Sequence, residues 1–281
     1  MIPLDFEYLL ASSLKDAVGR FVTAANARMS PLYYGGGTEI ITLSRLNQVY
    51  TDAVIDLKPI PETQALYETH GLLVLGACLP LTKISEDTGL TQAFPLLQRT
   101  VTEIADRTAR NKITLGGNIC GQIFYREAVL PLLICESRLR IAGPSGLREA
   151  SAMQVFRKRL RLSRGEFLAQ VVTSAAVRKA PFIHIKRRKM GNVGYPIITL
   201  AAISVDGQIR VGVSGLYPYP FRSEQMEAEL NRTDLAQEQR IERVLRMLSM
   251  EAILDDFEAS REYRLFVFRQ SLLEVLQQLK G

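Results

Sequence analysis

The pattern of apolar and polar positions predicts alternating helices and strands in the N-terminal part of the chain. Apolar residues three or four positions apart predict helices over 14–28 and 39–48. Short apolar runs at 32–34 and 54–57 predict strands, and a glycine turn links the first strand to the second helix. Together these elements predict a unit of the βαβ type.

The middle of the chain continues with mixed elements. Its pattern predicts strands at 72–77 and 139–142 and helices at 80–86, 91–104 and 126–135. A second glycine turn, ITLGGNIC at 113–120, lies where an extended run passes into the next element. Both glycine turns therefore occur at a junction between two elements.

The C-terminal part has longer runs that are typical of strands, followed by two helical stretches. The predicted strands are FLAQVVTS (167–174), FIHIKRR (182–188), GYPIITLAAISV (194–205) and IRVGVSGL (209–216), and the predicted helices cover 234–248 and 260–280. We therefore expect the α+β fold class, with a domain boundary near 170–178 and a smaller α+β domain after it.

The composition allows two globular domains. The chain has 281 residues, of which 47% are hydrophobic and 23% are charged. Its N-terminus has no basic segment followed by an uninterrupted apolar stretch, and no later run of about eighteen residues lacks a charge. We expect a soluble, cytoplasmic protein without membrane insertion.

The formal net charge is +6, and much of it lies in the basic runs 157–161 and 186–189. Such runs are typical of solvated loops, and also of surfaces that meet phosphates or an acidic partner. Both interpretations stay open. Aromatic residues do not interleave with the basic ones, so we expect no nucleic-acid binding.

The cysteines and histidines limit the chemistry of the chain itself. Cys78, Cys120 and Cys135 are too few and too widely spaced for a disulfide framework, a zinc site or an iron–sulfur cluster. The two histidines, His70 and His184, exclude a multi-histidine metal site. We expect no catalytic or metal-binding residues, so that any redox chemistry comes from a bound cofactor.

The stretch YYGGGTEI contains the first candidate site. Gly35, Gly36 and Gly37 precede Thr38 and a predicted helix, and successive N–H groups in such a turn suit phosphate oxygens. A Rossmann fingerprint would require glycine where Ile40 stands, and no Gly-Lys-Ser/Thr of a Walker loop occurs. A simple tight turn is the alternative interpretation.

The second cluster, 114–118, favours the phosphate interpretation. It reads Thr-Leu-Gly-Gly-Asn, and an asparagine after paired glycines can adopt the left-handed conformation and use its amide on a polar group. Two such loops in one chain suit a long ligand with a pyrophosphate in its middle.

Six segments of the chain occur in the order and spacing of one known family. They are YYGGGTEI (33–40), VIDLKPIPE (54–62), LLVLGACLPLTKI (72–84), RNKITLGGNIC (110–120), GEFL (165–168) and VGVSGLYPYPFRS (211–223). With them the chain resembles the FAD-binding medium subunit of the molybdenum hydroxylases, as in bacterial xanthine dehydrogenase and carbon monoxide dehydrogenase. The resemblance covers nearly the whole chain, and its pair G-G-T and T-[IL]-G-G-N is highly specific.

The resemblance implies a fold and a set of cofactor-binding residues. It implies a two-lobed FAD-binding domain of the vanillyl-alcohol-oxidase (PCMH) type over 1–172, with lobes of about 1–58 and 59–172. A smaller C-terminal domain like that of carbon monoxide dehydrogenase flavoproteins follows over 173–281. The implied pyrophosphate binders are Tyr33, Tyr34, Gly35, Gly36, Gly37, Thr38, Glu39 and Ile40, with Thr114, Gly117 and Asn118 at the flavin end and diphosphate, Ile104 near the isoalloxazine and Leu168 at the ring or adenine pocket.

Two further positions depart from the family pattern. Glu127 stands where the family commonly has an aspartate, so it is either a ribose acceptor or a surface helix glutamate. A lysine often follows the phenylalanine of the later strand, but here Phe182 is followed by Ile183. The nearest cation, Lys186, is either a group near the flavin or a solvated charge.

The resemblance also implies a role within a complex. A molybdenum-cofactor large subunit would oxidise the substrate, [2Fe–2S] clusters of a small subunit would carry electrons, and the FAD of this chain would pass them to NAD. Xanthine is the expected substrate, with carbon monoxide, nicotine or an aldehyde as alternatives. The arginine-rich loop 157–164 would dock on a cluster-bearing subunit or be an ordinary exposed loop. A flavin-free scaffold or assembly protein is the second interpretation, favoured by the altered segment 120–127.

Overall fold

The computed structural model describes residues 5–191 and 194–279, so Lys280, the end of the last predicted helix, lies outside the described residues. Contacts group the described chain into two compact units. The first unit contains the residues up to Asp87 together with Arg107–Gln122 and Glu136–Ser174. The second unit contains Thr88–Asp106, Ile123–Cys135 and the residues from Ala175 onward. The domain division after residue 172 stays a prediction.

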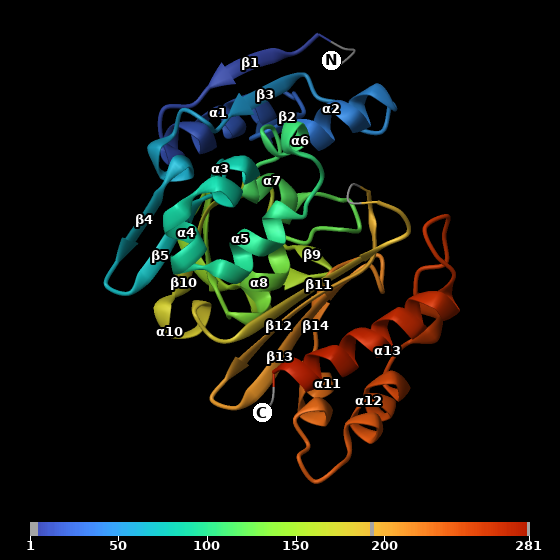
Figure 1. Cartoon of the computed structure of the whole chain (residues 1–281). Coiled ribbons are helices and arrows are strands. Elements are labelled where there is room, and N and C mark those ends of the chain that lie inside the picture. Colours follow the sequence, from blue (N-terminus) through green and yellow to red (C-terminus); the bar gives the residue numbers. More distant parts are fainter. Residues whose placement is uncertain (1–4, 192–193, 280–281) are drawn as a thin grey trace. The chain divides into compact units, whose positions relative to one another are not determined.

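The first unit begins with a parallel sheet. Its strands β1 (Glu7–Leu10), β3 (Ala53–Asp56) and β2 (Pro31–Tyr34) pair in that order, and α1 (Leu14–Asn26) and α2 (Thr38–Arg45) connect them (Figure 1). The predicted βαβ unit is thus confirmed as β2, α2 and β3. Because all three strands are parallel, their carboxyl ends lie at the same edge of the sheet.

An antiparallel sheet completes the first unit. Its order is β4 (Leu66–Thr69), β5 (Leu72–Gly76), β10 (Phe167–Ser174), β6 (Arg138–Gly143) and β7 (Gly146–Ser151). The other elements of this unit are η1 (Pro61–Gln64), α3 (Leu81–Glu86), α6 (Arg107–Arg110), α7 (Leu115–Cys120), α9 (Ala152–Val155), β8 (Phe156–Arg157) and β9 (Arg159–Leu160). Apolar side chains of α1, β3, β6 and β10 form one buried cluster, so the two sheets share a core.

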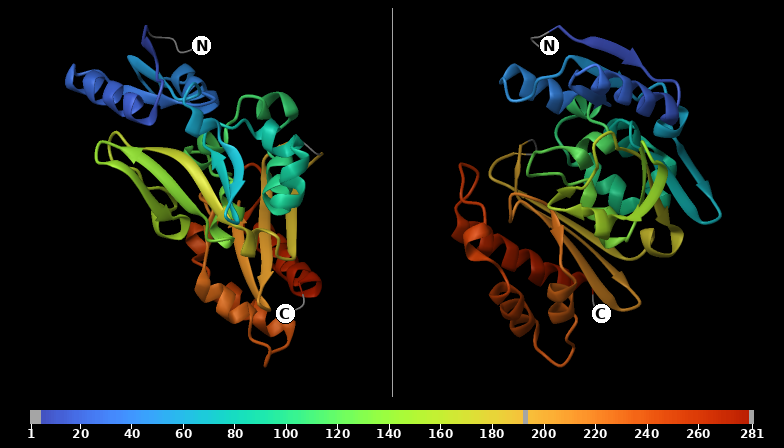
Figure 2. Two further views of the ribbon diagram at one scale, coloured as in Figure 1. Left: turned by 90° about the vertical axis from the view of Figure 1, so that its left-hand side faces the viewer. Right: turned by 180° about the vertical axis from the view of Figure 1, so that it is seen from behind.

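The second unit is an antiparallel sheet with helices on both faces. Its strands are β11 (Phe182–Arg188), β12 (Pro196–Val205), β13 (Gln208–Ser214) and β14 (Phe221–Arg222). Its helices are α4 (Thr88–Ala93), α5 (Pro95–Thr102), α8 (Val129–Ile134), α10 (Ala175–Arg178), α11 (Glu224–Leu230), α12 (Gln237–Arg246), η2 (Met250–Ala252) and α13 (Arg261–Gln278). Figure 2 shows α13, in red, beside the strands of this sheet.

Side-chain alternation assigns the two faces of the second sheet. Ile183 and Ile185 of β11 join the apolar cluster that contains buried residues of α11, α12 and α13. His184, Lys186 and Arg188 therefore lie on the other face, where β11 contacts α5. On β11, one face is thus apolar, whereas the other carries a row of charged or titratable groups.

Several predicted boundaries shift for local reasons. The helix predicted over 91–104 is broken into α4 and α5, because Pro95 begins α5 and keeps Phe94 out of the helical conformation, with φ of −148°. The turn predicted at 113–120 contains a short helix, α7, which begins directly after Thr114. The arginine-rich stretch contains the small hairpin β8–β9. Within the described residues, no helix is long and apolar enough to cross a bilayer.

Candidate cofactor-binding site

The first glycine loop begins where β2 ends, at the carboxyl edge of the parallel sheet. Residues 35–37 lead into α2, and Gly37 caps that helix with a φ of 71°, in the left-handed region. A Cβ at Gly37 would lie 2.2 Å from the Tyr34 ring, so a larger residue would displace that ring and would also take up an unfavourable positive φ. Open parallel sheets bind ligands outside the carboxyl ends of their strands, and the loop occupies such a place.

The two glycine loops pack directly on each other. A Cβ at Gly36 would lie 1.7 Å from the carbonyl oxygen of Lys112, and one at Gly35 would lie 2.9 Å from Thr114 Oγ1. The backbone of the first loop is therefore in close contact with the residues that lead into the second loop. The structure thus brings together two segments that lie far apart in the sequence, as a single ligand would require.

The Glu39 side chain fastens the second loop to the first. Both of its carboxylate oxygens accept from the backbone N–H of Gln122, at 2.9 and 2.8 Å. At the other end of the second loop, Thr114 Oγ1 accepts from the Gly117 N–H at 3.1 Å and caps α7. The Glu39 contact thus ties the end of α7 to the first loop, whereas the Thr114 contact caps the start of α7 within the second loop.

Backbone donors are available at the first loop. In the described part of the chain, the N–H groups of Gly36, Gly37, Thr38 and Ile40 donate to no protein acceptor. The first turn of a helix leaves such donors unsatisfied, and the positive end of the helix dipole adds to their attraction for anions. This set of donors fits the phosphate oxygens of a dinucleotide.

A lysine that the sequence analysis missed lies beside these donors. Lys58 Nζ donates to the carbonyl oxygen of Gly35 at 3.2 Å and to Asp56 Oδ1 at 2.7 Å, and it lies 4.4 Å from the centre of the Tyr34 ring. Asp56 also accepts from the Tyr8 hydroxyl, and this hydrogen bond raises the pKa of Tyr8 to about 12. An aspartate that ends a buried strand, with a lysine two positions later, was the available signal in VIDLKPIPE.

The two tyrosines before the glycines have different surroundings. The Tyr33 hydroxyl donates to the carbonyl oxygen of Gly165 at 2.8 Å, and its ring packs between Phe21 and Phe167. Burial raises the pKa of the Tyr33 phenol. Tyr34 instead lies under Lys58 and against Gly37. Tyr33 therefore anchors the start of the loop in the core, whereas Tyr34 shapes the loop itself.

The second loop is mostly buried. Asn118 is 8% exposed, and a Cβ at Gly116 would lie 2.7 Å from the Ala77 Cβ, which shows how closely α7 approaches the end of β5. Leu168 is buried in β10, the central strand of the antiparallel sheet. The structure thus places Thr114, Gly117, Asn118 and Leu168 in the same unit as the first loop.

The remaining predicted residues, Ile104, Glu127 and Lys186, belong to the second unit. Lys186 Nζ donates to Glu127 Oε2 at 2.8 Å, and their side chains are 2% and 4% exposed. Glu127 also accepts from the Thr199 hydroxyl. The interpretations of Glu127 as a surface glutamate and of Lys186 as a solvated charge are therefore wrong. Their contacts with the cofactor stay predictions.

Around Lys186 lies a charged cluster, defined by His184, Lys186 and Arg188 of β11 with Arg99 and Glu103 of the α5 segment. Lys186 Nζ donates to the carbonyl oxygen of Glu103 at 2.7 Å, and Arg188 donates to the Glu103 carboxylate at 3.0 Å. Burial, opposed by Glu103, lowers the pKa of His184 to about 4. Both His184 ring nitrogens are buried without a hydrogen-bond partner in the described residues. His184 is therefore neutral near pH 7.

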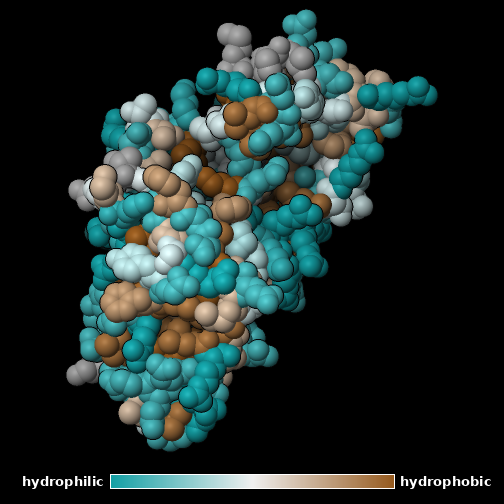
Figure 3. Space-filling view, turned by 90° about the vertical axis from the view of Figure 1, so that its right-hand side faces the viewer, coloured by the Kyte–Doolittle hydropathy of each residue, from teal (hydrophilic) through white to brown (hydrophobic). Residues whose placement is uncertain are grey.

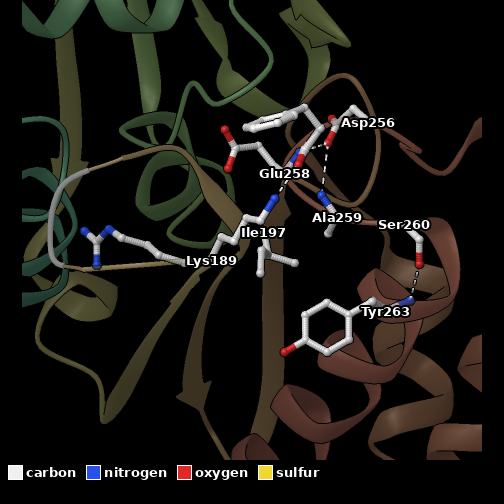
Figure 4. A pocket seen from close by; sticks show the side chains of 9 residues that line it. Lys189, Ile197, Asp256, Glu258, Ala259, Ser260 and Tyr263 are labelled. Atoms are coloured by element: carbon white, nitrogen blue, oxygen red, sulfur yellow. Dashed lines mark hydrogen bonds between the residues drawn. The ribbon is translucent and has the colours of Figure 1, made fainter.

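The second unit also has a cavity of about 360 Å³, shown in Figure 4. It is lined by Arg188, Lys189, Ile197, Asp256, Phe257, Glu258, Ala259, Ser260 and Tyr263. Two of its polar side chains are engaged: Lys189 donates to the carbonyl oxygen of Phe257 at 2.9 Å, and Asp256 pairs with Arg264 at 2.6 Å. None of the predicted cofactor-binding residues lines this cavity.

Comparisons with known proteins agree with the geometry of the first unit. The family described as FAD binding domain in molybdopterin dehydrogenase matches residues 4–173. The xanthine dehydrogenase FAD-binding subunit of Escherichia coli O157:H7 is 29% identical over 147 residues, which are 51% of this chain and 49% of that protein. The carbon monoxide dehydrogenase medium chain of Hydrogenophaga pseudoflava is 24% identical over 232 residues, covering 80% and 79%. The match to the xanthine dehydrogenase subunits spans about half of their length.

Solved structures share the fold over the whole chain. A chain of carbon monoxide dehydrogenase from Hydrogenophaga pseudoflava superposes with a TM-score of 0.87 at 20% identity and covers 99% of this chain and 98% of its own. A chain of quinoline 2-oxidoreductase from Pseudomonas putida 86 gives a TM-score of 0.84 at 19% identity, with coverage of 100% and 99%. The predicted fold class is confirmed.

Proposed function

We propose, from the premise that this chain belongs to the family of FAD-binding domains in molybdopterin dehydrogenases, that it is the FAD-carrying electron-transfer subunit of a molybdenum hydroxylase complex. The observation that carries this proposal is the contact between the two glycine loops, which places unpartnered amides, a buried asparagine and Lys58 within one unit. FAD is the cofactor of this family, and its pyrophosphate suits this donor set.

The residues of the chain would hold the cofactor in a fixed position. Amides of the first loop would donate to the phosphate oxygens, with the cation of Lys58 beside them. Thr114 and Glu39 would keep the second loop closed on the first. When bound, FAD supplies a centre that accepts electrons singly or in pairs, so it can link [2Fe–2S] clusters to the two-electron acceptor NAD.

The proposal also covers the partner subunits and the substrate of the complex. The clusters and the molybdenum cofactor would reside on a small and a large subunit, and the assembly would be cytoplasmic. We propose xanthine as the substrate, supported by the 29% identity to xanthine dehydrogenase FAD-binding subunits. Carbon monoxide and nicotinate are competing outcomes, because their dehydrogenases include similar subunits. Turnover of each substrate by the purified complex, with and without NAD, would distinguish them.

The visible absorption spectrum of the purified full chain, before and after FAD is added, tests the cofactor proposal. We expect flavin bands near one FAD per chain, and their loss in Gly36→Val and in Asn118→Ala. Gly19→Ala is the matched control, because a Cβ at this helix position meets nothing within 4 Å. Failure of the wild-type chain to take up FAD would instead favour the scaffold or assembly role.

A further inference from the structure

One short segment of the chain contains five cationic residues. Residues 157–164 contain Arg157, Lys158, Arg159, Arg161 and Arg164 and no carboxylate. The net charge of the whole chain is +6, so everything outside this segment carries a net charge of only +1. All five cationic residues are exposed. The segment is therefore strongly basic, whereas the rest of the chain is nearly neutral in net charge.

The hairpin β8–β9 holds three of these cations together at its tip. Phe156 pairs with Leu160, and both are buried, so the base of the hairpin is anchored in the first unit. Arg157 pairs directly with Arg159, an arrangement in which like charges repel. Lys158 turns the chain with a φ of 65°, which side chains other than glycine seldom adopt. The tip thus maintains a local arrangement that is unfavourable for the isolated chain.

Among the described residues, the arginines of this segment have no carboxylate partner, whereas some other exposed arginines do. Arg107 pairs with Glu86, and Arg148 pairs with Glu166. Among the described residues, no carboxylate forms an ion pair with any of the four arginines of the segment: Arg157, Arg159, Arg161 and Arg164. These guanidinium groups remain available for carboxylates of another molecule, which arginine binds with two parallel hydrogen bonds.

The hairpin also lies next to the candidate cofactor site. Strand β9 contacts α7, the short helix that contains Gly117 and Asn118 of the second glycine loop. Both elements belong to the first unit. A molecule bound at the hairpin would therefore lie beside the loop assigned to the flavin end of the site.

We propose that the basic hairpin, defined as residues 156–164, is the docking surface for an acidic face of the partner subunit that delivers electrons to this chain. The inference rests on the proposed function, because only an electron-transfer subunit needs such a partner beside its cofactor loop. The partner is chosen by charge complementarity, because four exposed arginines without a carboxylate partner among the described residues match a cluster of aspartate and glutamate side chains.

A protein partner fits the hairpin better than a nucleic acid. Four of the five cations are arginines, the cationic residue that is enriched in protein interfaces. Single-stranded nucleic acids need exposed aromatic rings for stacking, whereas the sole aromatic residue of the hairpin, Phe156, is 5% exposed. Figure 3 shows brown, hydrophobic atoms in the lower part of the molecule. Among the described residues, none of the exposed large hydrophobic side chains belongs to the hairpin.

Zero-length cross-linking of the assembled complex tests the contact directly. The complex is purified through a tag on the full-length chain, and a carbodiimide couples lysine amines to carboxylates in contact with them. We expect peptides in which Lys158 is joined to an aspartate or glutamate of a subunit that contains iron–sulfur clusters or molybdenum. Lys83, exposed in the same unit, is the internal control and should yield no such peptide. Absence of a Lys158 link to such a subunit would overturn the inference.

Charge reversal tests the energetic contribution. Arg157→Glu/Arg159→Glu should weaken association with the partner subunits about tenfold or more at low salt, and added salt should reduce the difference. Lys15→Glu/Lys83→Glu makes the same change in charge at exposed sites of the same unit and should leave association unchanged. Equal weakening by both pairs would contradict the inference.

The flavin spectrum distinguishes a failure of the inference from a failure of the proposed function. A hairpin variant that retains its FAD but loses its partner supports the inference. If the wild-type chain takes up no FAD, the proposed function is wrong. If the chain takes up FAD but Arg157→Glu/Arg159→Glu leaves association with the partner unchanged, only the inference is wrong. Binding of duplex DNA that disappears in the hairpin variant, with the complex intact, would assign the hairpin to nucleic acid and also overturn the inference.

Discussion

Substitution of Gly36 by alanine tests whether the contact between the loops creates the cofactor site. The new Cβ would lie 1.7 Å from the Lys112 carbonyl oxygen, whereas carbon and oxygen atoms in contact are separated by about 3.3 Å or more. The two backbones must therefore move apart by roughly 1.6 Å. Neither atom belongs to a flexible side chain, so the movement has to occur in the loops themselves.

The expected cost follows from overpacking. Forcing an extra methyl group into a packed site costs about 1–3 kcal/mol. If the loops relax when FAD is absent and are forced together when it is bound, this cost appears as weaker binding. Each 1.4 kcal/mol is about a tenfold change in Kd, so the Kd for FAD should rise roughly 5-fold to 140-fold.

Quenching of flavin fluorescence on titration into the FAD-free chain measures this Kd. Gly19→Ala is the control: it adds the same methyl group to α1, where nothing lies within 4 Å. Its Kd for FAD should be unchanged, and its stability should rise by up to about 1 kcal/mol, because alanine is the better helix former. If Gly36→Ala binds FAD as tightly as the wild type, the loop contact does not shape the site.

Three further predictions concern buried groups. Lys186→Met leaves the Glu127 carboxylate buried without its ammonium partner, so urea unfolding should show a loss of about 3–5 kcal/mol; an unchanged midpoint would contradict the buried pair. Burial lowers the pKa of His184 to about 4 in the folded chain, whereas the unfolded histidine titrates near 6.5. Between these values the unfolded chain binds a proton at His184 and the folded chain does not, so falling pH favours unfolding. Stability should fall in this window by up to about 3 kcal/mol more in the wild type than in His184→Asn, as measured by unfolding at several pH values. Burial raises the pKa of the Cys78 thiol to about 11, so iodoacetamide near neutral pH should modify exposed Cys120 first, and mass spectrometry that finds Cys78 modified first would refute this.

Much of the fold could be read from local sequence patterns. The runs at 32–34, 54–57, 72–77 and 139–142 all lie within observed strands or extend them by one residue. Strands such as β1, β4 and β7 were missed, because their residues are largely exposed and show no clear apolar alternation. Such strands form because a neighbouring strand offers hydrogen bonds, and that neighbour is distant in sequence.

The candidate site was predicted in part. The glycine loops, Thr114 and Asn118 stand out because glycine pairs next to capping residues have few structural alternatives. Lys58 was missed, because nothing local shows that its side chain reaches the carbonyl oxygen of Gly35, 23 positions earlier. The side-chain role of Glu39 was missed for the same reason: its partner, Gln122, lies 83 positions later.

The sequence by itself determined the fold class, the two glycine loops and the resemblance to one flavoprotein family, because these depend on local residue patterns. Only the tertiary structure decided that the two loops touch through Gly36 and Lys112 and that Glu127 and Lys186 form a buried pair. It also decided that the basic segment folds as a hairpin against α7. Each of these facts depends on which distant segments come within a few ångströms of each other, and this proximity results from packing the whole core rather than from any short stretch of residues.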